Sequence, residues 1–342
     1  MNDSGECASK PMKRNASPTV RGYSFQVGAG ISLMLDYVKE FSHIKIESAS
    51  DDIELTLNDG MKIYAQAKCV MQMDDQRNAS SDLKKALNAF KDDLEENPNA
   101  TKFIYITNIH NPLSSESKDA FTFGSIHNFS DLNADDQKNI EEKIGDSNFP
   151  HSKFQVQILW FFGEKNEKFR KIEEKIEKFL ISADISAGYS SRLLDDWRCL
   201  FTDNGSDKPE KDDGKELSKE YVIYSLIALL IESNTITDEN VRAVSGYEDF
   251  DDILMEFSKI INERICDYEF ITKIVGDYLT KLQSSNNNNY IYEFIEKEWQ
   301  NYEIQFLYLS DEVKRKALTK ILIFLVIRRH RIIMKATEAA NL

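Results

Sequence analysis

Residues 44–68 constrain the fold most, because two short segments there alternate apolar and polar side chains on either side of a turn. In residues 52–57 the odd positions are Ile or Leu, and the even positions are Asp, Glu or Thr. Such a period of two predicts a strand with one buried face. Residues 58–60 (Asn-Asp-Gly) form a turn sequence, and residues 62–68 (KIYAQAK) follow as the partner strand. The pattern therefore predicts a β-hairpin.

The same hairpin is expected to gather polar side chains where its second strand ends. Alternate residues of a strand share a face, so Gln66 and Lys68 are neighbours, and Asp52 on the preceding strand can face them. Two oxygen donors and a cation would then converge on one point, an arrangement that many nucleases use to hold a metal ion beside a scissile phosphate. Asp51 is the alternative ligand, although the alternation favours Asp52, whose side chain should lie opposite the apolar face.

The order of predicted elements indicates an α/β sandwich with a mixed central sheet. A helix begins near Gly22, the three strands of residues 44–68 follow, and a second helix covers residues 80–96. Buried strands are predicted at 102–108 and 154–162, with a helix near 133–144 between them. After Gly163 the periodicity is helical throughout.

Composition divides the chain into four predicted parts. Residues 1–20 are expected to be a flexible arm, and residues 21–201 an α/β domain with trailing helices. Residues 202–216, which are polar and contain Gly and Pro, are predicted to be a linker. Residues 217–342 are predicted to form an all-α C-terminal domain, with helices near 217–233, 248–267, 269–283, 289–309 and 311–335.

Charge and cysteine usage limit the function and the location. The chain has 342 residues and a net charge of −15, which is unusual for a protein that binds DNA, so DNA binding would need a local basic patch or a partner. Cys7, Cys69, Cys199 and Cys266 lack metal-ligand spacing and are predicted to be reduced thiols. The longest apolar runs are shorter than the ~20 residues that span a bilayer, and no signal peptide is evident. A cytoplasmic, soluble protein without membrane contact is expected.

Residues 21–163 resemble the double-stranded DNA endonuclease domain of bacterial anti-phage effectors, a branch of the PD-(D/E)xK restriction-endonuclease superfamily that includes CBASS effectors. The matching features are an opening helix, an acidic strand, a Q-x-K motif and a strand ending in Thr-Asn: residues 21–26 (RGYSFQ), Glu47 with Asp51-Asp52, Gln66-Ala67-Lys68, and Thr107-Asn108. The resemblance implies a restriction-endonuclease-like fold and a Mg²⁺-dependent phosphodiesterase that cuts DNA, with Mn²⁺ as the alternative ion.

Residue roles follow from this resemblance. The ion would be held by Asp52, the side-chain oxygen of Gln66, the carbonyl of Ala67 and DNA phosphate oxygens, and Lys68 would orient the attacking water. Many relatives have Glu where this chain has Gln66, so metal affinity should be weaker. Glu47 and Glu54 are candidates to supply the missing charge, and Gln26 to hydrogen-bond the site.

The length and helical character of the C-terminal part suit the nuclease subunit of Lamassu-type systems better than the CBASS branch, whose ligand-binding domain is α/β. That similarity implies an SMC-like ATPase partner that holds the nuclease inactive, a small accessory subunit, and a homo-oligomer when active, since cutting both strands of double-stranded DNA usually needs two sites. The alternative hypothesis is a catalytically weak nuclease fold used for DNA binding or complex assembly.

Two further sequence features concern helix packing and binding. Gly28 and Gly30 lack phosphate-loop spacing and are expected to let the first helix pack closely. Three arginines near the end of the chain, Arg328, Arg329 and Arg331, have three open interpretations: phosphate contact, docking on an acidic partner, or a cationic helix end that complements the helix dipole.

Overall fold

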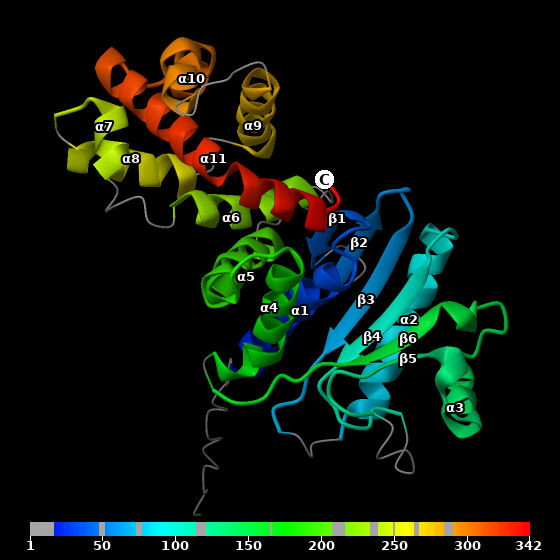
Figure 1. The fold of residues 1–342 in the computed structure, drawn as a ribbon. Coiled ribbons are helices and arrows are strands. Elements are labelled where there is room, and N and C mark those ends of the chain that lie inside the picture. Colours follow the sequence, from blue (N-terminus) through cyan, green and yellow to red (C-terminus); the bar gives the residue numbers. More distant parts are fainter. Residues whose placement is uncertain are drawn as a thin grey trace, which may run out of the picture.

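The protein folds into a twisted mixed sheet with helices on both faces and a bundle of helices at one end (Figure 1). The computed structural model describes residues 17–47, 52–72, 77–113, 121–164, 166–206, 216–232, 239–248, 250–262, 267–283 and 290–342. Within them the sheet has seven strands in the order β5-β6-β4-β3-β2-β1-β7. The strands are β1 Phe41–Ile46, β2 Ile53–Leu57, β3 Lys62–Lys68, β4 Lys102–Thr107, β5 Ile126–Asn128, β6 Phe154–Ile158 and β7 Leu217–Ser218.

The helices of the α/β part are α1 Ser17–Asp36, α2 Ala79–Glu96, α3 Ala134–Ile144, α4 Arg170–Ser182 and α5 Ser190–Ser206. The C-terminal bundle contains α6 Lys219–Glu232, α7 Glu239–Ser245, α8 Phe250–Asn262, α9 Tyr268–Leu282, α10 Tyr290–Glu298 and the long α11 Glu312–Ala340. An α/β region followed by a helical region therefore agrees with the sequence-based expectation. No helix in these ranges is long and apolar enough to cross a membrane.

The predicted hairpin is confirmed. β2 and β3 are antiparallel, with Ile53 opposite Ala65 and Leu55 opposite Ile63. β3 pairs in parallel with β4, and β4 in parallel with β6. The carboxyl ends of these three strands therefore meet at one edge of the sheet, which is where Lys68 lies.

Alternate strand residues supply two apolar clusters, one on each face of the sheet. Ile53, Leu55 and Ile63 pack with residues of α1, α4 and α5, whereas Tyr64 and Phe103 pack with residues of α2 and α3. Figure 1 shows the same division, with α1, α4 and α5 grouped on one side of β3 and α2 on the other.

Two glycines explain how closely α1 approaches its neighbours. A Cβ at Gly28 would lie 2.7 Å from Ile172 Cδ1 of α4, and a Cβ at Gly30 would lie 2.5 Å from Ile46 Cδ1 of β1. Both separations are shorter than ordinary Cβ contacts, so a side chain at either position would have to push the isoleucine aside, and glycine lets α1 pack closely. This confirms the structural interpretation of the Gly28–Gly30 sequence.

The second half of the chain is joined directly to the sheet. Leu217 and Ser218 form β7 and pair antiparallel with Ile44 and His43 of β1. Apolar residues of the sheet, of α1 and of the C-terminal helices form one continuous buried cluster. Whether residues 217–342 also fold as a separate domain stays a prediction.

Several boundaries differ from the sequence-based expectation. α1 begins at Ser17, inside the predicted arm, and α5 continues to Ser206, inside the predicted linker; residues 1–16 and 207–215 lie outside the described part. β5, β7 and α7 were not predicted, because segments of three, two and seven residues are too short to show a periodic pattern.

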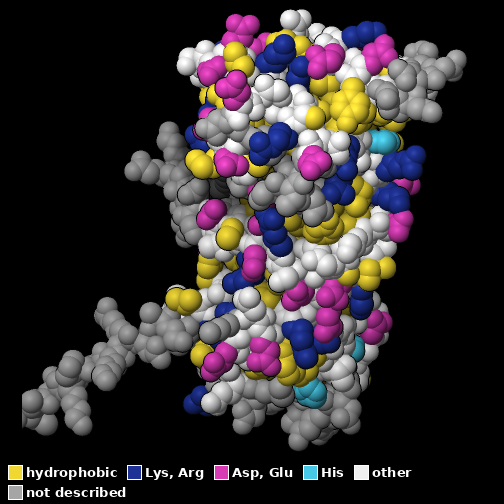
Figure 2. Space-filling model, turned by 60° about the vertical axis from the view of Figure 1, so that its left-hand side comes forward, with side chains coloured by type: hydrophobic (Ala, Val, Ile, Leu, Met, Phe, Trp, Pro, Cys, Tyr) yellow, Lys and Arg dark blue, Asp and Glu magenta, His cyan; other side chains and the backbone are white. Residues whose placement is uncertain are grey.

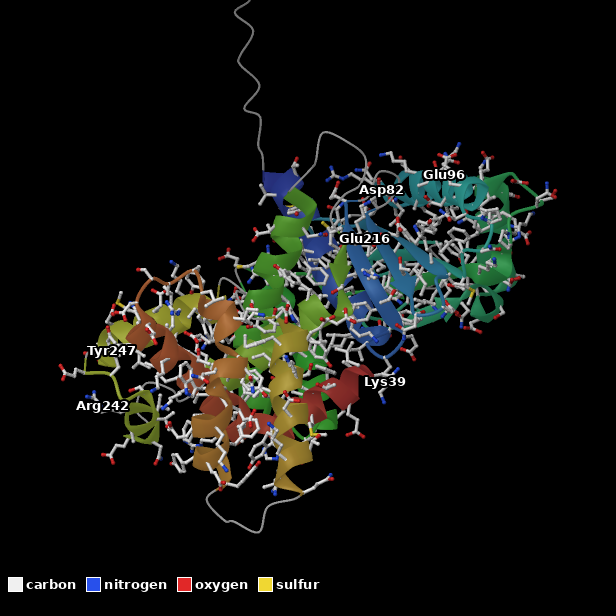
Figure 3. All side chains as sticks on the ribbon, turned by 90° about the horizontal axis from the view of Figure 1, so that it is seen from above. Lys39, Asp82, Glu96, Glu216, Arg242 and Tyr247 are labelled. Atoms are coloured by element: carbon white, nitrogen blue, oxygen red, sulfur yellow. The ribbon has the colours of Figure 1, made fainter. Side chains whose placement is uncertain are left out.

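A buried lysine links β1, α6 and the end of α11. Lys219 is 1% exposed, and its Nζ donates to the carbonyl oxygens of Lys39 and Ala340, each at 3.0 Å. The ammonium also lies 5.3 Å from the centre of the Phe41 ring. Burial lowers the pKa of Lys219, because a charge loses water contact inside the protein. Figure 3 shows Lys39 next to the C-terminal end of α11, as these bonds require.

Candidate active site

Asp52 is the centre of the candidate site, because side chains and backbone from two elements, α1 and β3, converge on its carboxylate. Gln26 Nε2 of α1 donates to Oδ1 at 2.7 Å. The backbone N–H of Ala67 and the ammonium of Lys68, both in β3, donate to Oδ2 at 2.8 Å each. Asp52 itself is 9% exposed. The structure therefore brings together four of the predicted residues, Gln26, Asp52, Ala67 and Lys68.

The position of Asp52 depends on the backbone around it. β2 begins only at Ile53, so Asp52 lies in a bend before the strand. Its carbonyl oxygen accepts from the N–H of Glu47, which closes the connection from β1 to β2. The carboxylate meets Gln26 of α1, the helix that also covers the apolar face of β2. Strict alternation therefore does not govern this residue, and its contacts are the better argument for its role; Asp51 lies outside the described residues.

Gln66 is buried beside this carboxylate in the sheet. Ile53 pairs with Ala65, so the residue that precedes Ile53 lies next to the residue that follows Ala65. Gln66 is 5% exposed and sits opposite Tyr105 of β4. The role of its side-chain oxygen as a ligand stays a prediction, and an amide would bring no charge to the site.

Of the two candidates for extra charge, Glu54 is paired away from Asp52, whereas Glu47 is bonded to Asp52 through its backbone N–H. Glu54 forms an ion pair with Lys62 at 2.5 Å, toward the turn end of the hairpin. Glu47 has a left-handed backbone with φ of 54°, and the described residues contain no hydrogen bond from its carboxylate to the site. Asp52 is thus the one carboxylate among the predicted ligands whose contacts include Lys68.

Asn108 holds the chain where it leaves the site. Its Oδ1 accepts from the N–H of Val70 at 2.7 Å, and its Nδ2 donates to the carbonyl of Val70 at 3.0 Å. Asn108 is fully buried, so this pair of bonds is shielded from water. Asn108, at the end of β4, therefore fixes the segment that follows Gln66-Ala67-Lys68.

Charges of both signs lie around the end of β3. Burial raises the pKa of the Cys69 thiol to about 11; the positive charges of Arg21 and Lys168 oppose this rise, and the negative charge of Asp82 adds to it. Asp82, which is labelled in Figure 3, lies in the first turn of α2. Sequence reasoning missed Asp82 and Lys168, because their influence on Cys69 depends on how distant segments pack.

The pKa of Cys69 leads to a pH-dependent prediction. Thiolate is the species that iodoacetamide attacks, so Cys69 should stay almost unlabelled at pH 8 and react as the pH approaches 11. Cys199 is exposed and serves as the internal control, which should label readily at pH 8. Mass spectrometry of a variant with Cys7→Ser and Cys266→Ser measures both rates. Equal labelling of the two thiols at pH 8 would contradict the burial of Cys69.

The donor set suits a weakly held hard cation. Mg²⁺ prefers oxygen ligands and is often bound through one or two carboxylates together with substrate phosphates. Asp52 supplies one carboxylate, and Gln66 and Ala67 supply neutral oxygens. Among the described residues, no group of three His, Cys, Asp or Glu side chains could hold a metal ion. An ion bound to one carboxylate and neutral oxygens would take further ligands from a phosphate or from water.

Comparison of the chain with protein-family models, with curated proteins and with solved structures finds no match. The site is therefore interpreted from its own geometry and from the resemblance of its motifs.

Proposed function

We propose that this protein is a Mg²⁺-dependent DNA endonuclease that acts as the effector subunit of a bacterial anti-phage complex. The observation that supports the proposal most is the convergence of Gln26, Ala67 and Lys68 on the buried carboxylate of Asp52. These residues come from three separate segments in the order helix, acidic strand, Q-x-K strand, which is the order of the PD-(D/E)xK family. An ordinary amphipathic hairpin has no reason to bury such a group.

Each residue has a role that its contacts suit. Gln26 and the Ala67 N–H orient the Asp52 carboxylate, so the site is held in place before DNA binds. Lys68, whose side chain is 27% exposed, can reach a phosphate while it stays tied to Asp52. Its ammonium would offset the negative charge that develops on the phosphorus oxygens during hydrolysis.

Asp52, Gln66 and Ala67 would hold Mg²⁺, with phosphate oxygens and water as the remaining ligands. When bound, the ion supplies charge neutralisation at the phosphate and a more acidic water. Oδ2 of Asp52 already accepts hydrogen bonds from Lys68 and from the Ala67 N–H, which compete with an ion for this oxygen. We therefore expect the ion to bind only when a phosphate supplies further ligands.

Partners follow from the resemblance and remain part of the proposal. An SMC-like ATPase and a small accessory subunit would control access to DNA, and a homo-oligomer would supply a second site for the opposite strand. The helical region formed by α6 to α11 would be the docking and oligomerisation surface. Figure 2 shows acidic and basic side chains interspersed among the described residues on one face, so broad electrostatic attraction to DNA is not expected there.

A second candidate function is a nuclease fold with little activity that binds DNA or assembles a complex. The observation that favours it is the neutral Gln66 together with the ion pair of Glu54 with Lys62, which removes one of the two candidates for extra charge. This function predicts DNA or partner binding without a Mg²⁺-dependent product.

The test is cleavage of supercoiled and linear plasmid DNA by the purified protein, with Mg²⁺ or with EDTA. Cutting that requires Mg²⁺ and is lost in Asp52→Asn supports the nuclease. Binding without cutting under any metal, also after the partner subunits are added, would support the second function and contradict the first.

A further inference from the structure

Three cations gather around the rings of Phe161 and Phe169. Arg21 and Lys168 both lie against the ring of Phe161, at 5.7 Å and 5.2 Å from its centre. Lys168 and Arg198 both lie against the ring of Phe169, at 5.3 Å and 4.1 Å. The two rings are themselves in edge contact at 5.1 Å. We call Arg21, Lys168 and Arg198 the basic cluster.

The cluster is held in place by the fold. Nη2 of Arg21 donates to the carbonyl oxygen of Phe161 at 2.6 Å, and Arg21 and Phe25 of α1 both contact the Phe161 ring. Phe169 is fully buried and fixes the ring on which Arg198 rests. Side chains that are already ordered lose less entropy when they bind a ligand.

Little negative charge compensates the cluster. Among the described residues, Arg21 and Lys168 form no ion pair with a carboxylate, and Arg198 has one, with the exposed Asp195 at 3.0 Å. Burial, together with the charges of Arg21 and Arg198, lowers the pKa of Lys168. Three cations held together in a chain of net charge −15 indicate a specific anionic ligand, because mutual repulsion opposes such an arrangement.

The cluster is close to the residues of the candidate site. Arg21 lies on α1, as does Gln26, which binds Asp52. The charges of Arg21 and Lys168 act on Cys69, the residue that follows Lys68 in the chain. A strand of DNA whose phosphate is at Lys68 would therefore pass the basic cluster with its neighbouring phosphates.

We infer that the basic cluster of Arg21, Lys168 and Arg198 binds the phosphate backbone of double-stranded DNA next to the bond that is cut. The inference rests on the proposed nuclease function. It also explains how an acidic protein binds DNA: contact is concentrated in one small patch beside the site. Point charges on aromatic rings recognise phosphate without base contacts, so binding through the cluster should not depend on sequence.

The experiment measures binding of the full-length protein to a fluorescent DNA duplex in EDTA, where no cutting occurs, over a series of salt concentrations. The test variant is Arg21→Gln/Lys168→Gln/Arg198→Gln. The matched control is Arg192→Gln, since Arg192 is an exposed arginine of the same helix as Arg198 and is paired with Glu232. Each phosphate contact contributes about 0.9 to the slope of log K against log salt.

The triple variant should bind roughly tenfold or more weakly, and its salt slope should fall by about two to three, while the control keeps the wild-type slope. If the melting temperature shows that the triple variant is poorly folded, Lys168→Gln alone is used. This single variant should reduce the salt slope by about one, and Lys168→Arg should keep the wild-type slope. An unchanged slope and affinity in a folded variant, with wild-type protein still cutting DNA, would overturn the inference and leave the nuclease intact. Wild-type protein that neither binds nor cuts DNA would overturn both.

Discussion

Replacement of Lys68 by alanine should reduce DNA cleavage by roughly 10²–10³-fold or more, because the change removes the cation that would face the reacting phosphate in the proposed nuclease. The fold should remain intact. The ion pair with Asp52 is partly exposed, so its loss costs on the order of 1 kcal/mol or less, and Asp52 keeps its bonds to Gln26 and Ala67. Initial rates of plasmid cleavage at saturating Mg²⁺ and the melting temperature measure the two effects.

Lys62→Ala is the matched control for this prediction. Lys62 is on the same strand, three alternate positions before Lys68, and is also paired with a carboxylate of the hairpin, Glu54. The pair lies at the other end of β3, away from Asp52, so cleavage should stay near the wild-type rate. Wild-type cleavage by Lys68→Ala would remove this site from the mechanism, and equal loss in both variants would indicate a general effect of charge or folding.

Replacement of Lys219 by alanine should lower the free energy of unfolding by about 2–4 kcal/mol. The change leaves a cavity where the aliphatic stem packed, and it removes the donor that satisfies the carbonyl oxygens of Lys39 and Ala340. These bonds attach the end of α11 to the segment before β1, so hydrogen exchange should rise in β1 and in the last turns of α11. Urea unfolding followed by circular dichroism measures the free energy.

Two variants separate the causes of this loss. Lys219→Met keeps most of the buried stem and removes the charge, so it should cost less than alanine. The side chain of Lys39 is exposed, and Lys219 donates to the backbone carbonyl of Lys39, which alanine retains. Lys39→Ala should therefore alter the free energy of unfolding by less than about 0.5 kcal/mol. A stability of Lys219→Ala within that same range would show that the buried lysine does not fasten the two halves of the chain.

The local elements of the α/β part could be predicted because their causes are local. Alternation in residues 52–57 and 62–68 identified β2 and β3, and the turn sequence at 58–60 joined them correctly. Helical spacing located α2 within one residue of its start. The sequence also indicated Asp52 and Lys68 as neighbours, because the hairpin brings the start of β2 beside the end of β3.

Prediction failed where distant contacts decide the outcome. Glu54 was a candidate to supply the missing charge, but its carboxylate pairs with Lys62 across the hairpin. β7 is two residues long and exists because β1 offers an unpaired edge at that point. The bend at Asp52 also has no signal in the alternation, which continues through it.

The sequence by itself determined the hairpin, its register and the residue types that form the candidate site, because period-two alternation and a turn are properties of neighbouring residues. Tertiary structure alone decided that Gln26 of α1 reaches Asp52, that Asn108 bonds to Val70, and that Arg21, Lys168 and Arg198 meet on the rings of Phe161 and Phe169. These residues are separated by tens to more than a hundred positions in the chain. Their meeting depends on the packing of α1, α4 and α5 on one face of the sheet, and that packing is set by the whole apolar core rather than by any single segment.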